Sequence, residues 1–328
     1  MTSDNAKNST KEFDFVKDET RGHEVITSSN SNQGSPERRT DVETNQKSVI
    51  SSDKGNRQNA ATVNVTITDQ DNPIVILFGP SQCGKTMTLV RLTRYLSSQF
   101  AFVPDKAFKD SSDDEYKTLC DNFDNAVDRD EAADGTNYID FMLLRVNQKQ
   151  NRHGTICQFL ESPGEYLFDP DNKDAGFPGY FQTILDAPNR RIWVFFLEPT
   201  LSNEEKKAYV RKITQDITFG NQDRFIFLVN KIDMPITKRF MTTTDSIDEA
   251  GLRKYVDEAF RDLTSCEKFT IEKIFSTKEL YRIIGFQTGT YTWGKTADGN
   301  PFKTFHAGHD SHPKRLWQAI EGAVNGEW

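Results

Sequence analysis

An apolar run, PIVILF (73–78), continues directly into GPSQCGKT (79–86), and no other junction in the chain limits the possible folds so strongly. The run is typical of a buried strand, and the residues after Lys85 repeat apolar side chains at helical spacing. The segment between them has the pattern G-x-x-x-x-G-K-[ST], in which a loop surrounds an anion with backbone N–H groups. Gly79 and Gly84 allow the loop to bend tightly, and the positive end of the helix points at the anion. The sequence therefore predicts a strand, a phosphate-binding loop and a helix, in that order.

Two side chains of this loop have specific roles in the pattern. We expect Lys85 to reach the β- and γ-phosphates of a nucleotide, and the Thr86 hydroxyl to bind Mg²⁺. A helix N-terminus can lower the pKa of a thiol, but we interpret Cys83 as a small residue that the loop tolerates. The predicted phosphate-binding residues are Gly79, Ser81, Gln82, Cys83, Gly84, Lys85, Thr86 and Met87.

A second motif indicates which base the nucleotide carries. The strand-like run FIFLVNKID (225–233) ends in the pattern N-K-x-D. The carboxylate of Asp233 can accept hydrogen bonds from the N1–H and N2–H₂ groups of guanine together, whereas adenine would leave it unpaired. We expect Asn230 to contact the N7 and O6 side of the base and to tie loops together, with the Lys231 stem packed over the ring. The motif predicts guanine and disfavours an ATP-using enzyme.

The third motif lies in GTICQFLESPGEYLF (154–168), which predicts a strand and then a loop. With this motif the chain resembles, from about residue 73 to its C-terminus, the P-loop GTPases of the translation-factor-like and Ras-like class, and among them the bacterial double-GTPase branch. That class has D-x-x-G at this place. The resemblance implies that Glu161 replaces the Asp that holds Mg²⁺ through water, that Gly164 meets the γ-phosphate with its N–H, and that Glu165 takes the position that orients the attacking water.

Two of these residues depart from the pattern of that class. Glu161 keeps the charge of Asp but adds a methylene, so the metal shell must be rearranged. Glu165 places a negative charge beside a phosphate, which argues against efficient hydrolysis. The resemblance therefore implies a guanine-nucleotide switch that uses GTP, GDP and Mg²⁺, hydrolyses GTP slowly, and acts through a protein effector or a second GTPase. The alternative is a scaffold that binds GTP without turnover.

The alternation of strand and helix patterns predicts an α/β fold with a mostly parallel sheet, one antiparallel hairpin, and helices on both faces. We predict the hairpin from YIDFMLLRVNQ and HGTICQFLES across 148–152, and a helix after RIWVFFLEPT with Ser202 as N-cap. Residues 1–60 are polar and predict a disordered tail, either a tether or a partner-binding arm. Residues 61–328 form the predicted GTPase-like domain, with insertions at about 101–137 and 279–312.

Two loops leave alternatives open. In the resembling class a threonine before the hairpin closes on Mg²⁺; Thr136 is the candidate, Thr118 is the alternative, and Thr136 also suits a turn beside Gly135. A backbone N–H that reads guanine O6 is expected either from Ser276 and Thr277 or from the loop within IIGFQTGTY (283–291). That second region also predicts a hairpin around residues 298–299.

Composition limits the partners and the compartment. The net charge of −8 disfavours nucleic acid, since no excess of positive charge is available to neutralise phosphates. Apolar runs are too short to span a membrane, and the N-terminus lacks an apolar signal region. Four scattered cysteines indicate free thiols in a reducing compartment, so we predict a cytoplasmic protein. His306, His309 and His312 have spacing that could suit Zn²⁺, but the intervening Gly308 and adjacent Pro313 favour a polar loop.

Overall fold

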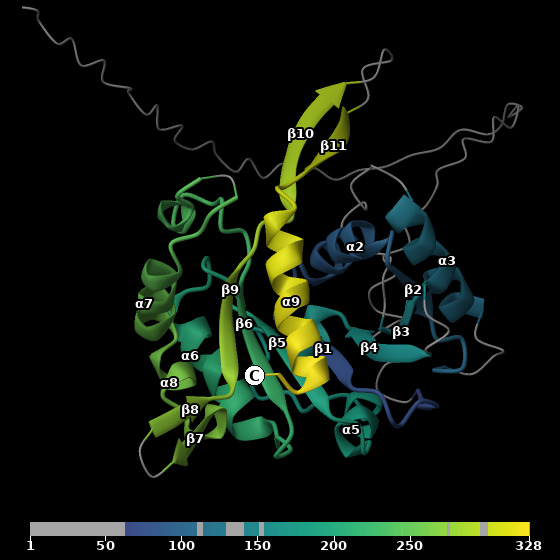
Figure 1. Cartoon of the computed structure of the whole chain (residues 1–328), viewed down its shortest axis with the longest axis horizontal. Coiled ribbons are helices and arrows are strands. Elements are labelled where there is room, and N and C mark those ends of the chain that lie inside the picture. The colour runs from purple at the N-terminus through teal and green to yellow at the C-terminus, as the bar shows by residue number, and fades with distance from the viewer. Residues whose placement is uncertain are drawn as a thin grey trace, which may run out of the picture. The chain divides into compact units, whose positions relative to one another are not determined.

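The computed structural model describes residues 63–109, 114–128, 141–150, 154–243, 245–273, 276–295 and 301–327 (Figure 1). All of them belong to one compact unit, residues 50–328. The N-terminal segment predicted to be a disordered tail lies outside these ranges, and so does Thr136. No helix within the described part of the chain is long and apolar enough to cross a membrane.

The core of the fold is a seven-stranded sheet with the order β2-β3-β4-β1-β5-β6-β9. Its strands are β1 (Ile74–Phe78), β2 (Phe100–Pro104), β3 (Met142–Gln148), β4 (Thr155–Glu161), β5 (Arg191–Phe196), β6 (Arg224–Val229) and β9 (Tyr281–Gly285). The strands β4, β1, β5, β6 and β9 are parallel to one another, and the pairs β3–β4 and β2–β3 are antiparallel. This confirms the predicted mostly parallel sheet and its hairpin. The sequence did not predict β2, which adds a further antiparallel strand at the edge.

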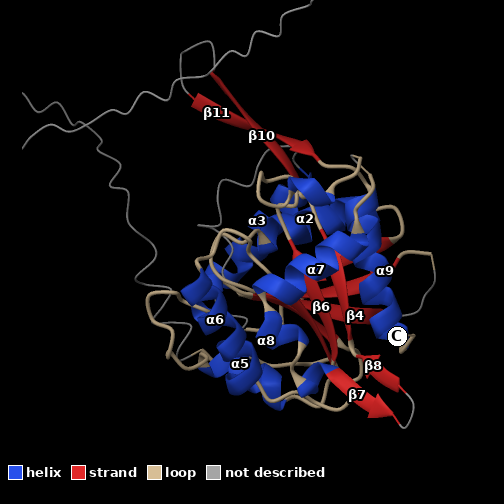
Figure 2. Cartoon of the chain, turned by 90° about the vertical axis from the view of Figure 1, so that its left-hand side faces the viewer, coloured by secondary structure: helices blue, strands red, loops and turns tan. Residues whose placement is uncertain are grey.

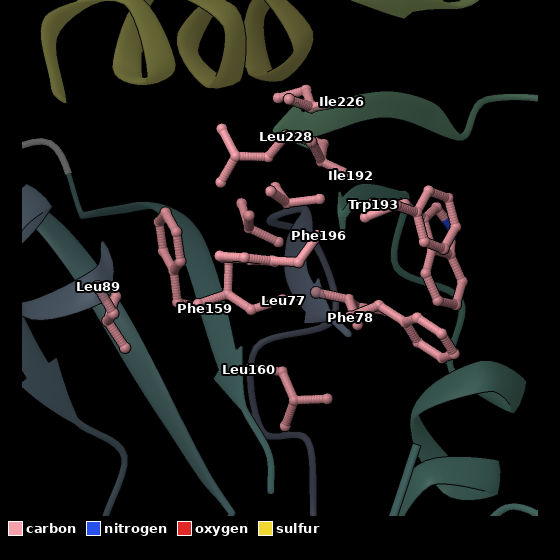
Figure 3. Packing of buried hydrophobic residues seen from close by; sticks show 14 of the residues in the cluster. Leu77, Phe78, Leu89, Phe159, Leu160, Ile192, Trp193, Phe196, Ile226 and Leu228 are labelled. Atoms are coloured by element: carbon pink, nitrogen blue, oxygen red, sulfur yellow. The ribbon is translucent and has the colours of Figure 1, made fainter. Parts of the chain in front are cut away.

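The strand β1 lies at the centre of the sheet because it is apolar on both sides. Neighbouring residues of a strand face opposite sides of a sheet, and Ile74 through Phe78 are all buried. On one side the ring of Phe78 packs edge to face against Trp193 of β5, with centroids 6.2 Å apart, near Leu160 (Figure 3). A continuous apolar run thus fixes the strand that leads into the phosphate loop.

Helices cover this sheet and connect its strands (Figures 1 and 2). They are α2 (Lys85–Leu96), α3 (Asp114–Asp128), α4 (Gly164–Leu167), α5 (Gly179–Asp186), α6 (Asn203–Arg211), α7 (Glu249–Ala259), α8 (Arg261–Thr264) and α9 (Ser311–Asn325), with a π-helical turn (Lys212–Asp216) that continues α6. The predicted cap of α6 is confirmed: the Glu205 N–H donates to Ser202 Oγ at 3.2 Å, and the Ser202 N–H donates to Glu205 Oε2 at 2.8 Å. Helix α9 lies against β5, β6 and β9.

Three segments differ from the prediction or complete it. The start of the predicted domain, residues 61–68, alternates polar and β-branched residues but is not a strand where it is described. Val65 and Ile67 are nevertheless buried, and Thr66 N–H donates to Phe108 O. Residues Asp114–Asp128 of the predicted insertion form the helix α3, where Thr118 Oγ1 donates to Asp114 O, so Thr118 is not a loop residue. The predicted hairpin near the C-terminus is confirmed by β10 (Gly289–Lys295) and β11 (Pro301–Ala307), which pair only with each other. Its turn, 296–300, is outside the described ranges.

Candidate functional site

The loop between β1 and α2 is shaped by glycines at two close approaches. Gly84 has a φ of +93°, and a Cβ built on it would lie 2.4 Å from Asn230 Nδ2. A Cβ on Gly79 would lie 2.7 Å from Phe196 Cβ and 2.8 Å from Cys83 Sγ. Both contacts are shorter than side chains tolerate, so the loop keeps this path only with glycine at 79 and 84.

The ammonium of Lys85 lies inside this loop. Lys85 is only 5% exposed, and its Nζ donates to Gly79 O at 3.0 Å and to Pro80 O at 2.9 Å. Lys85 is also the first residue of α2, whose first turn has no side-chain cap among the residues that the structure describes. The first N–H groups of a helix have no partners within the helix, and they carry a partial positive charge. The loop thus joins a buried cation to a helix N-terminus, which together suit an anion.

Beside the loop, the hydroxyl of Thr86 donates to Glu161 Oε1 at 2.5 Å. Glu161 ends β4 and is 2% exposed, and its Oε2 has no hydrogen-bond partner among the described residues. Burial raises the pKa of Glu161 to about 7, although Lys85 and the Thr86 hydroxyl both oppose the rise. A buried carboxylate oxygen without a partner, beside a threonine hydroxyl, fits Mg²⁺, which takes hard oxygen ligands.

The part of the chain that is described contains no group of three or more His, Cys, Asp or Glu able to hold a metal ion. An ion between Thr86 and Glu161 would therefore complete its shell with water and ligand oxygens, as Mg²⁺ commonly does. The three histidines do not form a zinc site either: His306 is in β11, His309 follows it, and His312 is buried in α9. The interpretation of that segment as a polar loop is wrong at two of the three positions, because His306 lies in the strand β11 and His312 in the helix α9.

The segment after β4 lies directly on the phosphate loop. A Cβ built on Gly164 would lie 2.1 Å from Ser81 N and 2.2 Å from Pro80 C, so only glycine fits there. The next residue, Glu165, is half-buried in the first turn of α4 and forms no hydrogen bond with another described residue. The two segments that the sequence associates with phosphate thus touch through backbone atoms.

The N-K-I-D segment reaches the same loop from β6. Asn230 is 1% exposed, and its Nδ2 donates to Cys83 O at 2.8 Å, which confirms that Asn230 ties the two loops together. Lys231 has a φ of +54°, its carbonyl accepts from Thr237 Oγ1 at 3.0 Å, and its Nζ lies 2.8 Å from Glu198 Oε2. Asp233 is half-buried and its carboxylate forms no hydrogen bond with another residue in the described ranges.

One predicted loop is wrong. Ser276 and Thr277 belong to β8 (Ser276–Glu279), which pairs with β7 (Thr270–Lys273) in a separate two-stranded sheet and not at the end of a strand of the main sheet. The alternative, the loop after β9, is the one beside the N-K-I-D segment. There Ile232 N–H donates to Phe286 O at 3.1 Å, and Phe286 N–H donates to Val229 O at 2.9 Å.

Cys83 is 1% exposed, and its environment raises the pKa of its thiol. Burial is the largest influence and raises the pKa of its thiol, and Glu198 and Glu161 add to this, while Lys85 and Lys231 oppose it. The interpretation of Cys83 as a tolerated small residue is consistent with this. Met87 is half-buried in the first turn of α2.

Two residues that sequence patterns do not mark, Glu198 and Thr237, hold the two ends of Lys231. Glu198 lies two residues after the end of β5, and a lone carboxylate near the end of the run RIWVFFLEPT was the available signal. Thr237 is fully buried, but nothing in its sequence neighbourhood marks it.

Comparison with known proteins gives no family. No family model matches the chain, and no curated protein matches it. Among solved structures, a Plasmodium falciparum protein described as nucleolar GTP-binding protein 1 has 13% identity and a TM-score of 0.37, over 80% of this chain and 91% of that one. The GDP-bound Roco2 RocCORdC protein of Methanosarcina barkeri has 11% identity and a TM-score of 0.33, over 81% of this chain and 52% of that one.

A third solved structure is the septin GTPase domain of Chlamydomonas reinhardtii, with 12% identity and a TM-score of 0.33, over 79% of this chain and 92% of that one. This chain spans about half the length of the Roco2 chain. All three TM-scores are below 0.5, so these likenesses carry no function over to this chain.

Proposed function

We propose that this protein is a Mg²⁺-dependent guanine-nucleotide switch that hydrolyses GTP slowly and acts through a protein partner. The observation that carries the proposal is the meeting of three segments at one edge of the sheet. The phosphate loop follows β1, Glu161 ends β4, and Asn230 follows β6 and donates to Cys83 O in the loop. The C-terminal ends of parallel strands are where α/β sheets bind ligands.

At the phosphate end, Lys85 and the N-terminus of α2 would bind the β- and γ-phosphates of GTP. Thr86 and Glu161 would hold Mg²⁺, which when bound neutralises charge on the phosphate oxygens. At the base end, Asp233 would accept from guanine N1–H and N2–H₂. A backbone N–H from the loop after Phe286 would reach O6, because this loop is bonded to Ile232.

The switching element would be the segment from Glu161 to α4. Gly164 lies on the backbone of Pro80 and Ser81, so a γ-phosphate held by the loop would contact this segment and its loss would release it. A partner that binds only one arrangement of the segment would then read the nucleotide. We place the protein in the cytoplasm for the compositional reasons given above.

We predict that the isolated protein turns over below about one GTP per minute. Glu165 can only accept hydrogen bonds when ionised, and its charge would oppose the charge that develops on the phosphate. Glu165→Gln should therefore leave single-turnover phosphate release unchanged or raise it. Fast hydrolysis by the pure protein that Glu165→Gln abolishes would identify Glu165 as a general base and contradict this prediction.

Two measurements test the proposal as a whole. We expect GTP, but not ATP, to displace a fluorescent GDP analogue from the protein. We also expect this displacement by GTP to be lost when Mg²⁺ is chelated. Equal displacement by ATP would remove the guanine assignment.

The second candidate, a scaffold without turnover, is favoured by the unpartnered carboxylate of Glu165 in the described part of the chain. Some GTPases are accelerated by a partner that places an arginine beside the γ-phosphate. The scaffold predicts no phosphate release even with such a partner, whereas the switch predicts acceleration.

A further inference from the structure

Glu198 lies at the end of β5, next to the segment that would read the base. The pairing of β5 with β6 extends one residue beyond β5, since Leu197 N–H donates to Leu228 O at 2.8 Å. This places Glu198 alongside the end of β6 and the start of the N-K-I-D segment. Glu198 is 5% exposed, so its carboxylate is withdrawn from water.

The carboxylate is ion-paired through one oxygen and hydrogen-bonded through the other. Oε2 lies 2.8 Å from Lys231 Nζ, in an ion pair without hydrogen-bond geometry, and Oε1 accepts from Thr200 Oγ1 at 2.7 Å and from Thr200 N–H at 3.4 Å. A buried carboxylate is costly unless it is paired and hydrogen-bonded, and here both conditions are met. The hydrogen bonds from Thr200 therefore orient the Glu198 carboxylate toward Lys231.

Lys231 is consequently held at both ends. Its backbone has a φ of +54°, with the carbonyl held by Thr237 Oγ1 and the preceding residue, Asn230, bonded to the phosphate loop. Its ammonium is held by Glu198, although the side chain is 34% exposed. The aliphatic stem spans the distance between these anchors. A lysine on the surface samples many rotamers, and the contact with a buried carboxylate favours one of them here.

We infer that Glu198 is a positioning residue that fixes the Lys231 stem as one wall of the base site. The inference rests on the proposed function, because it concerns the base of the same nucleotide. A wall that is ordered in advance does not lose rotamer freedom when the ligand binds, and this raises affinity without a new contact to the ligand. The gain concerns the base alone, so it should be the same for GMP, GDP and GTP.

The opposite possibility makes a different prediction. If Glu198 acted through its charge on the phosphates, its removal would strengthen binding, and the effect would grow with the charge of the ligand from GMP to GTP. The partners of Glu198 do not support this, since Lys231 neutralises it directly. The two possibilities are distinguished by whether the change in affinity depends on the number of phosphates in the nucleotide.

The test is displacement of a fluorescent GDP analogue by GMP, GDP and GTP from the full chain and from Glu198→Gln. We expect the variant to weaken all three by one common factor of about 10. Glu204→Gln is the matched control, because Glu204 is exposed at the start of α6 and the same charge is lost there; it should change nothing. Unchanged affinities in Glu198→Gln, or a factor that changes with phosphate number, would overturn the inference.

Two further variants keep the test decisive. Thr200→Val removes the shorter of the two hydrogen bonds to Oε1 and keeps the one from the backbone N–H. It should weaken the three nucleotides equally by about threefold, whether or not Glu198→Gln folds. Lys231→Met should weaken them as Glu198→Gln does, and the double variant should be no weaker than either single one, because both remove one contact. Fully additive losses would contradict a shared role. Absence of guanine-nucleotide binding by the unaltered chain is a separate outcome, which refutes the proposed function itself.

Discussion

Asp233→Asn is expected to weaken GTP binding by about 10³–10⁴-fold and to create binding of xanthosine triphosphate. A carboxylate accepts from N1–H and N2–H₂ of guanine, whereas an amide presents a donor that matches the C2 carbonyl of xanthine. A polar group left unpaired in a closed site discriminates strongly, which is why the effect is large. Displacement of a fluorescent GDP analogue by the two triphosphates measures both changes.

The matched control for this change is Asp262→Asn. Asp262 is exposed in α8, so the same substitution there removes an equal charge away from the proposed base site. It should leave both affinities unchanged. If the Asp233→Asn variant keeps its preference for GTP, the N-K-I-D segment does not recognise the base. That result would contradict the guanine assignment but not the assignment of the phosphate loop.

Glu161→Gln is expected to weaken binding of Mg²⁺–GTP by about 10–100-fold, and yet to stabilise the nucleotide-free protein above neutral pH. The loss follows because an amide is a poorer partner for a metal shell than a carboxylate. The gain in stability follows because the buried Glu161 carboxylate carries a charge above neutral pH, and its Oε2 has no partner among the described residues to offset the cost of burying that charge. Titration with Mg²⁺ at fixed GTP measures the first effect.

The pH dependence of stability measures the second. The pKa of Glu161 is about 7 in the folded protein and near 4.5 ordinarily, so between these values the folded protein binds more protons than the unfolded chain. The contribution of this group to stability is therefore present at low pH and is lost as pH rises toward about 7. Thermal unfolding with EDTA and without nucleotide should show a smaller fall from pH 5 to pH 8 in Glu161→Gln than in the unaltered chain. Parallel curves would show that Glu161 does not titrate there.

The parts of the fold that sequence predicted are those set by local signals. The run before Gly79 is buried on both sides, so its apolar continuity alone identified β1, and the glycines marked the loop. The cap of α6 was equally local, because Ser202 and Glu205 satisfy each other within one turn. The N-K-I-D segment could be placed at a strand end because β6 is a continuous apolar run.

The parts that sequence missed depend on contacts between distant segments. Ser276 and Thr277 follow a strand-like run, but whether that run joins the main sheet depends on strand pairing. The strand that pairs with β6 is β9, and the run before Ser276 pairs with β8 instead. The strand β2 is short and lies at an edge with one neighbour, so its burial pattern is weak. The partnership of Glu198 with Lys231 joins two strand ends, and no spacing within either segment encodes it.

The close approach of Gly84 to Asn230 restricts how this chain can diverge over generations. A side chain at 84 is opposed twice, by the φ of +93° and by Nδ2 at 2.4 Å. Shortening Asn230 first would relieve the contact but not the backbone strain, and it would release Cys83 O from its donor. The effect of a substitution at Gly84 therefore depends on the residue at position 230, and the reverse also holds. Two motifs far apart in the sequence should be inherited as one unit, and a lineage that loses either should lose both.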